Sequence, residues 1–315
     1  MVQLRLSVPP ALRDTVLPLL YDDPAVRNVV VLRDAARDPD GDAVLADVAR
    51  ERAGGLLAHL DELGLARSGA VSLQELTAAP YAGAVAAERA APGSPEDGVI
   101  WRVVEDQAQA AVRPGWGFHA FLWLAVALAA VAVVTDSSIL VVGAMVVGPE
   151  FSLVAAACVG LALRRPRLAA RAAVVLVTGF ALAVAVVTVL ALLARVGGWV
   201  TVDDVLAPRP LTGFIWRPDR WSLVVALLAG IAGVLSTTSG RASALVGVFI
   251  SVTTVPAAGN LALGLAVWSP AEMGGSLAQL GLNLAGMVVA GTATLLGQRA
   301  YWSAMSSRRT ARLPR

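Results

Sequence analysis

The sequence predicts a polytopic α-helical membrane protein with a small soluble α+β domain at its N-terminus. Three observations support this fold class. First, 57% of the 315 residues are hydrophobic and only 15% are charged, whereas soluble globular chains carry about 25% charged residues. Second, the apolar residues gather in long runs, each of the length that crosses a bilayer, and the first begins only near Phe118. Third, residues 1–76 contain the short alternating segments of a small soluble domain.

The two parts of the chain carry opposite charge. Residues 1–112 hold 10 Arg and 17 acidic residues, a net of −7, whereas residues 113–315 hold 15 Arg and 6 acidic residues, a net of +9. All 25 basic residues are arginine. Because the arginines lie beside apolar runs, we attribute them to membrane topology and expect no nucleic-acid partner.

Residues 1–76 contain a regular succession of strand and helix signals. Residues 2–8 alternate apolar and polar side chains, and Asp40-Gly41 marks a turn between two later strands. The expected elements are a strand at 2–8, a helix at 10–20, strands at 26–32 and 42–48, a helix at 49–64 and a strand at 68–75. This β-α-β-β-α-β order is that of the split βαβ, ferredoxin-like fold.

The next segment joins this domain to the membrane body. Residues 77–94 are rich in Ala, Gly and Pro and are expected to form a linker. Residues 97–112 are amphipathic, so they either lie on the membrane or pack on the soluble domain, and we expect packing. The predicted domains are a cytoplasmic ferredoxin-like domain at 1–76, a linker with an amphipathic helix at 77–112, a six-span body at 113–299 and a basic cytoplasmic tail at 300–315.

Six runs in the body are long and apolar enough to cross a bilayer. They are residues 116–135, 138–163, 170–195, 221–238, 242–267 and 276–298. Buried helices of a large soluble protein can be equally apolar, but six in succession with almost no polar face favour membrane spans. Arginines follow the second span and fill the C-terminal tail, which favours an inner-membrane protein with both termini in the cytoplasm.

The second and fifth spans resemble one another. Each begins with a serine, has a glycine soon after and reaches a proline near its middle, Pro149 in the second span and Pro256 in the fifth. Equivalent positions are separated by about 104 to 107 residues. The repeat therefore contains three spans, and because three is odd, the second copy enters the membrane from the opposite side. Inverted repeats of this kind are typical of secondary transporters.

Proline inside each of these spans predicts a broken helix. Proline removes one backbone hydrogen bond and clashes with the preceding turn. Residues 139–148 rise about 15 Å at 1.5 Å per residue, so Pro149 is expected near the membrane midplane, with Pro256 approaching it from the other side. One such proline can be a simple structural kink. Two at matched positions favour a transport site.

Few polar residues lie near these breaks, so the candidate site is small. Glu150 is the only acidic residue inside any predicted span. It is either ionised, with the helix dipoles stabilising its charge, or protonated because it is desolvated, and the sequence leaves both open. The candidate substrate- or ion-binding residues are Gly148, Pro149, Glu150, Ser251, Thr253, Thr254, Pro256, Asn260 and Asn283. We expect no metal site and no cofactor.

Two blocks of this sequence resemble a known family. Residues 137–172 (SSILVVGAMVVGPEFSLVAAACVGLALRRPRLAARA) resemble the signature block of the domain-of-unknown-function 389 (DUF389) family, and 243–266 with 280–291 resemble its second block. The resemblance covers about 116–298 and implies a multi-span membrane protein, often with an N-terminal soluble domain, but no settled activity. Glu150 departs from the family, which usually has an apolar residue there, so a role for Glu150 would be specific to a subgroup.

These patterns favour membrane transport of a small solute or ion by a secondary transporter or channel. The alternative is a membrane-anchored sensor or scaffold whose soluble domain binds a partner or small ligand, although an anchor needs only one or two spans. An enzyme is not expected, because the sequence has no metal-ligand cluster, nucleophile–base set or phosphate-binding loop. Exposed edge strands of a ferredoxin-like domain favour a homo-oligomer, most simply a dimer in the lipid bilayer.

Overall fold

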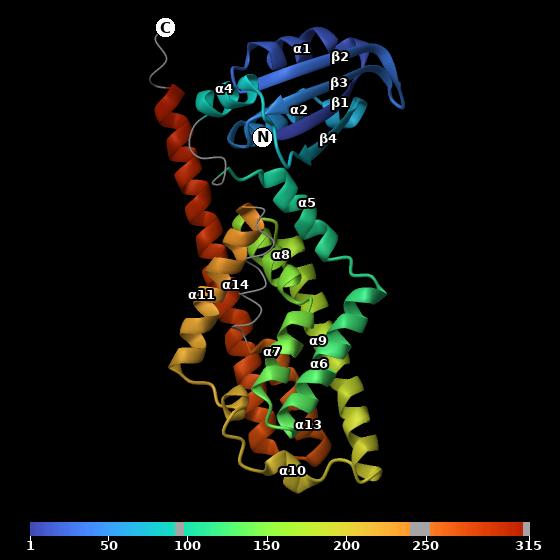
Figure 1. The fold of residues 1–315 in the computed structure, drawn as a ribbon, viewed down its shortest axis with the longest axis vertical. Helices are drawn as coiled ribbons and strands as arrows, with labels where there is room; N and C mark the ends of the chain where they lie inside the picture. The colour runs from blue at the N-terminus through green and yellow to red at the C-terminus, as the bar shows by residue number, and fades with distance from the viewer. Residues whose placement is uncertain (92–97, 240–252, 311–315) are drawn as a thin grey trace. The chain divides into compact units, whose positions relative to one another are not determined.

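The structure, a computed structural model, describes residues 1–91, 98–239 and 253–310, without the side chains of 303–310 (Figure 1). These residues form two compact units, Met1–Val104 and Glu105–Arg315. The first contains a small sheet with helices, and the second is helical.

The N-terminal unit is built on a four-stranded antiparallel sheet in the order β2-β3-β1-β4. Its elements are β1 (Val2–Val8), η1 (Pro10–Leu12), α1 (Arg13–Asp22), β2 (Val26–Arg37), β3 (Asp40–Val48), α2 (Arg50–Glu62), α3 (Leu65–Ser68) and β4 (Ala70–Glu75). The predicted order of strands and helices is confirmed. The first strand lies between the third and the fourth, as in a split βαβ sheet.

The core of this unit follows from the two-residue period of β1. Alternate residues of a strand share one face, and Val2, Leu4, Leu6 and Val8 are all fully buried. They belong to one hydrophobic cluster with residues of α1 and α2, among them Leu20, so both helices cover the same face of the sheet.

Residues 77–94 were predicted to form a linker, but the structure contains a helix within them. Helix α4 (Ala82–Ala90) is rich in alanine, the residue with the highest helix propensity. Its Ala84 and Ala87 are buried, and the hydroxyl of Tyr81 before it donates to Asp47 Oδ2 at 2.9 Å. Burial and the neighbouring Asp47 raise the pKa of Tyr81 to about 12. Because alanine side chains are small, a helix whose buried face consists of alanine has no strong apolar period, and its sequence resembles that of a flexible linker.

The helical unit contains several apolar helices. It comprises the end of α5 (Trp101–Ala111), then α6 (Trp116–Val134), α7 (Ser138–Val147), α8 (Phe151–Ala162), α9 (Pro166–Val196), α10 (Val202–Leu206), η2 (Gly213–Trp216), α11 (Arg220–Ser239), α13 (Thr254–Val267) and α14 (Pro270–Thr310). Among the described residues, four helices are long and apolar enough to cross a membrane, α6, α9, α11 and α14. The bent pair α7–α8 raises this number to five.

The fifth predicted span, 242–267, falls partly on residues 240–252, which lie outside the described residues. Its second half is α13, a shorter apolar helix of 14 residues. The outward faces of the long helices are apolar, and Val174, Val177 and Leu193 of α9 are each at least 60% exposed. Exposed apolar surface of this extent needs a lipid or protein cover, so the apolar helices indicate a membrane-embedded protein.

The helix break predicted in the second span is confirmed. Helices α7 and α8 meet at Pro149 with a bend of 54°. Pro256 instead lies in the first turn of α13, which begins at Thr254. The first four N–H groups of a helix have no partner within it, so proline there removes no helical hydrogen bond.

Helices α8 and α13 end in the same way. Arg164 after α8 and Trp268 after α13 both have a φ of 55°. The next N–H then bonds back five residues, from Arg165 to Gly160 O at 2.7 Å and from Ser269 to Gly264 O at 2.8 Å. This left-handed termination stops each helix, and the next helix starts at the following proline in both cases.

Candidate functional site

The two helix starts bring Glu150 and Thr254 into contact. Glu150 is the residue immediately before α8, and Thr254 is the first residue of α13. The Thr254 hydroxyl donates to Glu150 Oε1 at 2.8 Å, and both residues are buried, 1% and 6% exposed respectively. Two candidates 104 residues apart in sequence therefore form one polar contact.

The second carboxyl oxygen of Glu150 differs from the first in its hydrogen bonding. Glu150 Oε2 is buried and has no hydrogen-bond partner in the described part of the chain. A buried polar atom without a partner costs about 1–3 kcal/mol, and more when it is charged. Such an oxygen is a position for a proton, a cation or a hydrogen-bond donor of a small ligand.

Gly148 makes room for this carboxyl group. A side chain at position 148 would overlap Glu150 Oε2 and Val255 Cγ2. Its backbone has φ −67° and ψ 129°, which other residues adopt readily. The requirement for glycine is therefore space beside Glu150, not an unusual conformation.

A second polar cluster surrounds Thr253, the residue before Thr254. Thr253 Oγ1 accepts hydrogen bonds from Gln279 Nε2 and Asn283 Nδ2 of α14, both at 3.0 Å. These three residues line a cavity of about 250 Å³ together with Arg217, Trp221 and neighbouring residues. Asn283 is thus placed on a cavity wall beside Thr253, the neighbour in sequence of Thr254.

Asn260 belongs to a different cluster. Its amide Nδ2 donates to Glu272 Oε2 at 2.6 Å and to Ser276 Oγ at 2.8 Å, and its Oδ1 accepts from Arg209 Nη1 at 2.6 Å. Arg209 and Glu272 also pair directly, with side chains 4% and 6% exposed. Asn260 lies six residues beyond Thr254, about 9 Å along the helix and near its middle, so its partners differ from those of Thr254.

Sequence reasoning missed this buried ion pair. Arg209 lies between the third and fourth predicted spans, and Glu272 precedes the predicted sixth span. Neither has a sequence pattern that would point to the other, since they are 63 residues apart. Of the remaining candidates, Pro256 is buried in the first turn of α13, Pro149 lies at the bend, and Ser251 lies outside the described residues.

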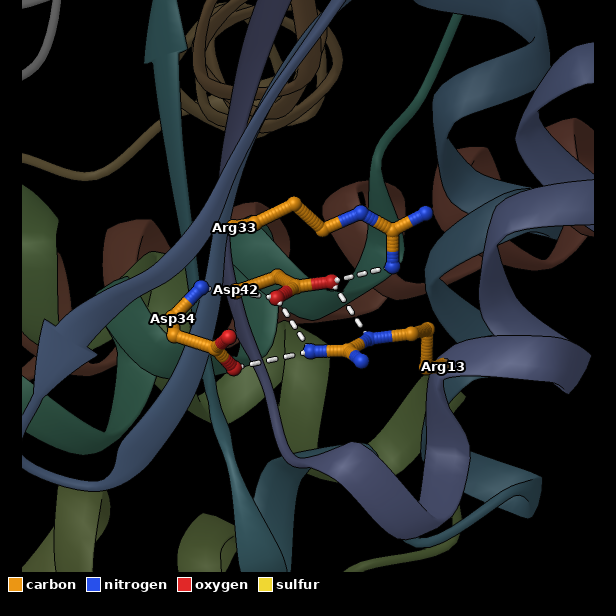
Figure 2. Close-up of polar contacts among 4 residues, drawn as sticks. All are labelled: Arg13, Arg33, Asp34 and Asp42. Carbon is orange, nitrogen blue, oxygen red and sulfur yellow. Dashed lines mark hydrogen bonds and ion pairs between the residues drawn. The ribbon is translucent and has the colours of Figure 1, made fainter.

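The N-terminal unit has its own buried carboxylate, Asp42, shown in Figure 2. Arg13 donates to both of its oxygens, at 2.7 and 2.6 Å, and Arg33 Nη1 and the Asp34 N–H add bonds at 3.1 and 3.0 Å. The hydrogen bond from Arg13 lowers the pKa of Asp42. Because both oxygens already have protein partners, we interpret this cluster as structural: it joins α1 to the β2–β3 hairpin.

Groups of three or more His, Cys, Asp or Glu residues that could hold a metal ion are not found among the described residues. The candidate residues that the structure describes therefore contribute to three polar groups: the Glu150–Thr254 contact, the Thr253 cavity and the Arg209–Glu272 cluster.

Comparison with known proteins adds a family but no function. Neither a curated protein nor a solved structure matches the chain. Residues 145–289 match the model of the Domain of unknown function (DUF389). The match runs from α7 to α14 and includes both helix starts, so the resemblance seen in the sequence is confirmed. The description of the matching DUF389 family names no activity.

Proposed function

We propose that this protein moves a small solute or ion across the membrane and binds it beside Glu150 and Thr254. The observation that carries the proposal is the buried Glu150 Oε2, which has no hydrogen-bond partner among the described residues. An ionisable residue inside a membrane protein is costly and usually functional. Helix starts beside it supply N–H groups and partial positive charge, the arrangement found at transporter binding sites.

The inverted repeat of three spans that the sequence predicts would support the same proposal, and several spacings agree with it. Glu150 and Thr254, Gly160 and Gly264, and Pro166 and Pro270 are all separated by 104 residues. If a two-fold axis relates the two three-span halves, a residue can touch its own equivalent in the other half only close to that axis. The direct bond between Glu150 and Thr254 is the contact that such an axis predicts.

Two hydrogen bonds between the halves, which link equivalent pairs of residues, support the repeat independently. Arg195 of α9 donates to the carbonyl of Ala266 in α13, and Arg299 of α14 donates to the carbonyl of Ala162 in α8. Each residue of the first bond differs by 104 from its counterpart in the second. Exchanging the halves therefore converts one bond into the other, as expected for two copies that pack reciprocally.

The repeat implies six spans with both termini on one side of the membrane, and the arginine-rich tail favours the cytoplasmic side. In this topology α9 leaves the cytoplasmic side and α11 returns from the outside, so residues 197–219 are external. The cavity at Thr253 includes residues from this segment and the start of α11, such as Arg217 and Trp221. We assign it as the external approach to the site, with room for an ion or a small solute.

Flux into proteoliposomes tests the proposal. Purified full-length protein would be assayed with protons, alkali and divalent cations, and small anions, using wild type, Glu150→Gln and Thr254→Val. We expect flux of at least one of these ligands, reduced tenfold or more in Glu150→Gln and less strongly in Thr254→Val. Thr178→Val is the matched control, because the Thr178 hydroxyl is exposed and bonds only to carbonyls of its own helix. Flux equal to that of empty liposomes, or unchanged in Glu150→Gln, would overturn the proposal.

The alternative function is a membrane-anchored sensor or scaffold. The observation that favours it is the hydrophobic core of the N-terminal unit, which is built from that unit's own strand and helix residues, so this unit is a compact domain in its own right. In this case the helical unit is only an anchor, and no ligand crosses the membrane. The same flux assay distinguishes the two functions.

A further inference from the structure

We propose that a pocket at the start of α9 binds the phosphate group of an anionic phospholipid. The pocket has a volume of about 460 Å³ and lies wholly within the Glu105–Arg315 unit. Its wall includes residues of α5, the segment after it and the short connection between α8 and α9. The inference is independent of the transport proposal, because none of these residues belongs to the Glu150 site.

Charge is the first property that identifies the ligand. Five arginines line the pocket against a single carboxylate, that of Glu105. The arginines are Arg113, Arg164, Arg165, Arg167 and Arg171. Of these five arginines, only Arg165 has an acidic partner among the described residues, Glu105 Oε1 at 2.9 Å. All five arginines are exposed, and several like charges around one cavity favour an anion.

Local structure explains why the arginines gather. Helix α8 ends at Ala162, Arg164 takes the left-handed conformation, and α9 begins at Pro166. This tight turn brings three arginines into the space between two helices. Arg167 lies in the first turn of α9, and Arg171, four residues later, lies on the same helix face. The free N–H groups of a helix start add to the attraction for phosphate.

The position along α9 favours a lipid over a free phosphate ion. Helix α9 is 31 residues long and strongly apolar, so its start lies where a spanning helix leaves the hydrocarbon. Phospholipid headgroups occupy this depth, and basic pockets between membrane helices bind anionic headgroups. The wall also contains Val112 and Leu168, which suit the apolar part of a lipid. Arginine binds phosphate through two parallel N–H bonds, which lysine cannot do.

Native mass spectrometry of the purified full-length protein can measure this binding. The protein would be titrated with phosphatidylglycerol, with zwitterionic phosphatidylcholine and, in a separate arm, with inorganic phosphate. We expect selective retention of phosphatidylglycerol, and we expect millimolar inorganic phosphate not to displace it. Each arginine near an anionic lipid surface contributes about fivefold in affinity, so Arg167→Gln/Arg171→Gln should weaken binding about 25-fold.

Two further variants make the test specific. Glu105→Gln removes the acidic partner of Arg165, so it should strengthen binding several-fold, an effect that loss of folding cannot produce. Arg220→Gln removes an exposed arginine outside the pocket and should leave binding unchanged. If the double glutamine variant fails to insert, Arg167→Lys/Arg171→Lys keeps the charge and should still bind several-fold more weakly.

Three results would overturn the inference. These are equal binding of phosphatidylcholine and phosphatidylglycerol, phosphatidylglycerol binding that the glutamine and lysine variants leave unchanged, and displacement of the lipid by inorganic phosphate. The last would assign the pocket to a free anion.

Discussion

At the scale of single residues, the carboxyl group of Glu150 depends on the absence of a side chain at position 148. A methyl group on Gly148 would overlap Glu150 Oε2 and Val255, and overpacking of this kind costs about 1–3 kcal/mol. Gly148→Ala should therefore displace the carboxyl group, lower flux and lower the apparent melting temperature. Gly143→Ala is the matched control on the same helix, because its methyl group would meet only Leu128, at an ordinary 3.7 Å. Equal effects of the two substitutions would contradict the positioning role of Gly148.

Asp42 gives a prediction for the pH dependence of the N-terminal unit. Its pKa is lowered chiefly by the hydrogen bond from Arg13. A carboxylate with a lowered folded-state pKa stabilises the fold above its unfolded pKa of about 3.9, and this contribution is lost as pH falls through the folded value. Hydrogen exchange of peptides from β2 and β3 should show protection that decreases in acid.

The Asp42→Asn variant should have lower protection at neutral pH and a smaller further loss in acid. Asp14→Asn replaces an exposed acid of the same unit and should behave as wild type. An unchanged acid profile in Asp42→Asn would show that another carboxylate controls this unit.

At the scale of elements, local patterns in the sequence predicted most of the fold. The alternation at residues 2–8 predicted β1, and Pro149 predicted the bend between α7 and α8. The Asp40-Gly41 signal predicted a β2–β3 hairpin but misplaced its turn, which lies at residues 38–39, because Asp40 and Gly41 already pair with β2 as part of β3. Helix α4 was missed because its buried face is alanine, whose small side chain gives no strong apolar period. The meeting of Glu150 with Thr254 depends on packing between distant helices, which no local pattern contains.

The pair formed by Arg209 and Glu272 was missed for the same reason, and it gives a prediction about α13 and α14. Both side chains are buried, and Asn260 bonds to both. Removing one partner of a buried ion pair leaves an uncompensated charge and costs about 3–5 kcal/mol. Glu272→Gln should therefore lower the apparent melting temperature in detergent by several degrees.

Control variants distinguish the effect of breaking the Arg209–Glu272 ion pair from the effect of removing any acidic residue. Asp203→Asn removes an exposed acid from the segment between α9 and α11 that also contains Arg209, and it should have little effect. Replacing both partners, as in Arg209→Met/Glu272→Met, should cost less than the sum of the two single changes, because neither charge is then left alone. Additive losses would show that the two residues act independently.

At the scale of the whole molecule, the proposed dimer concerns the exposed edge of the sheet. Strand β2 is an edge strand, and its Val30 and Leu32 are 39% and 51% exposed. Edge strands with exposed apolar residues tend to associate. Native mass spectrometry in mild detergent should show a dimer that Leu32→Glu converts to monomer. Tyr21→Glu, on the helical side of the sheet, is the control. A monomeric wild-type protein would contradict the proposed dimer.

The proposed inverted repeat makes a stricter prediction about the whole molecule, because it determines which side of the membrane each segment reaches. Three spans separate the N-terminal unit from residues 197–219: α6, the bent pair α7–α8, and α9. An odd number of spans places these two regions on opposite sides. If the α7–α8 pair instead enters and leaves on one side, only two spans intervene and both regions lie on the same side.

Cysteine labelling in sealed cells distinguishes these arrangements. The only native cysteine, Cys158, is buried, so the unmodified chain should not react with a membrane-impermeant maleimide. Trp199 is 87% exposed after α9, and Ser68 is exposed in the N-terminal unit. Trp199→Cys should react in intact cells, whereas Ser68→Cys should react only after the membrane is opened. Reaction of both or neither in intact cells would exclude three spans between them, and with it the inverted repeat on which the proposed site depends.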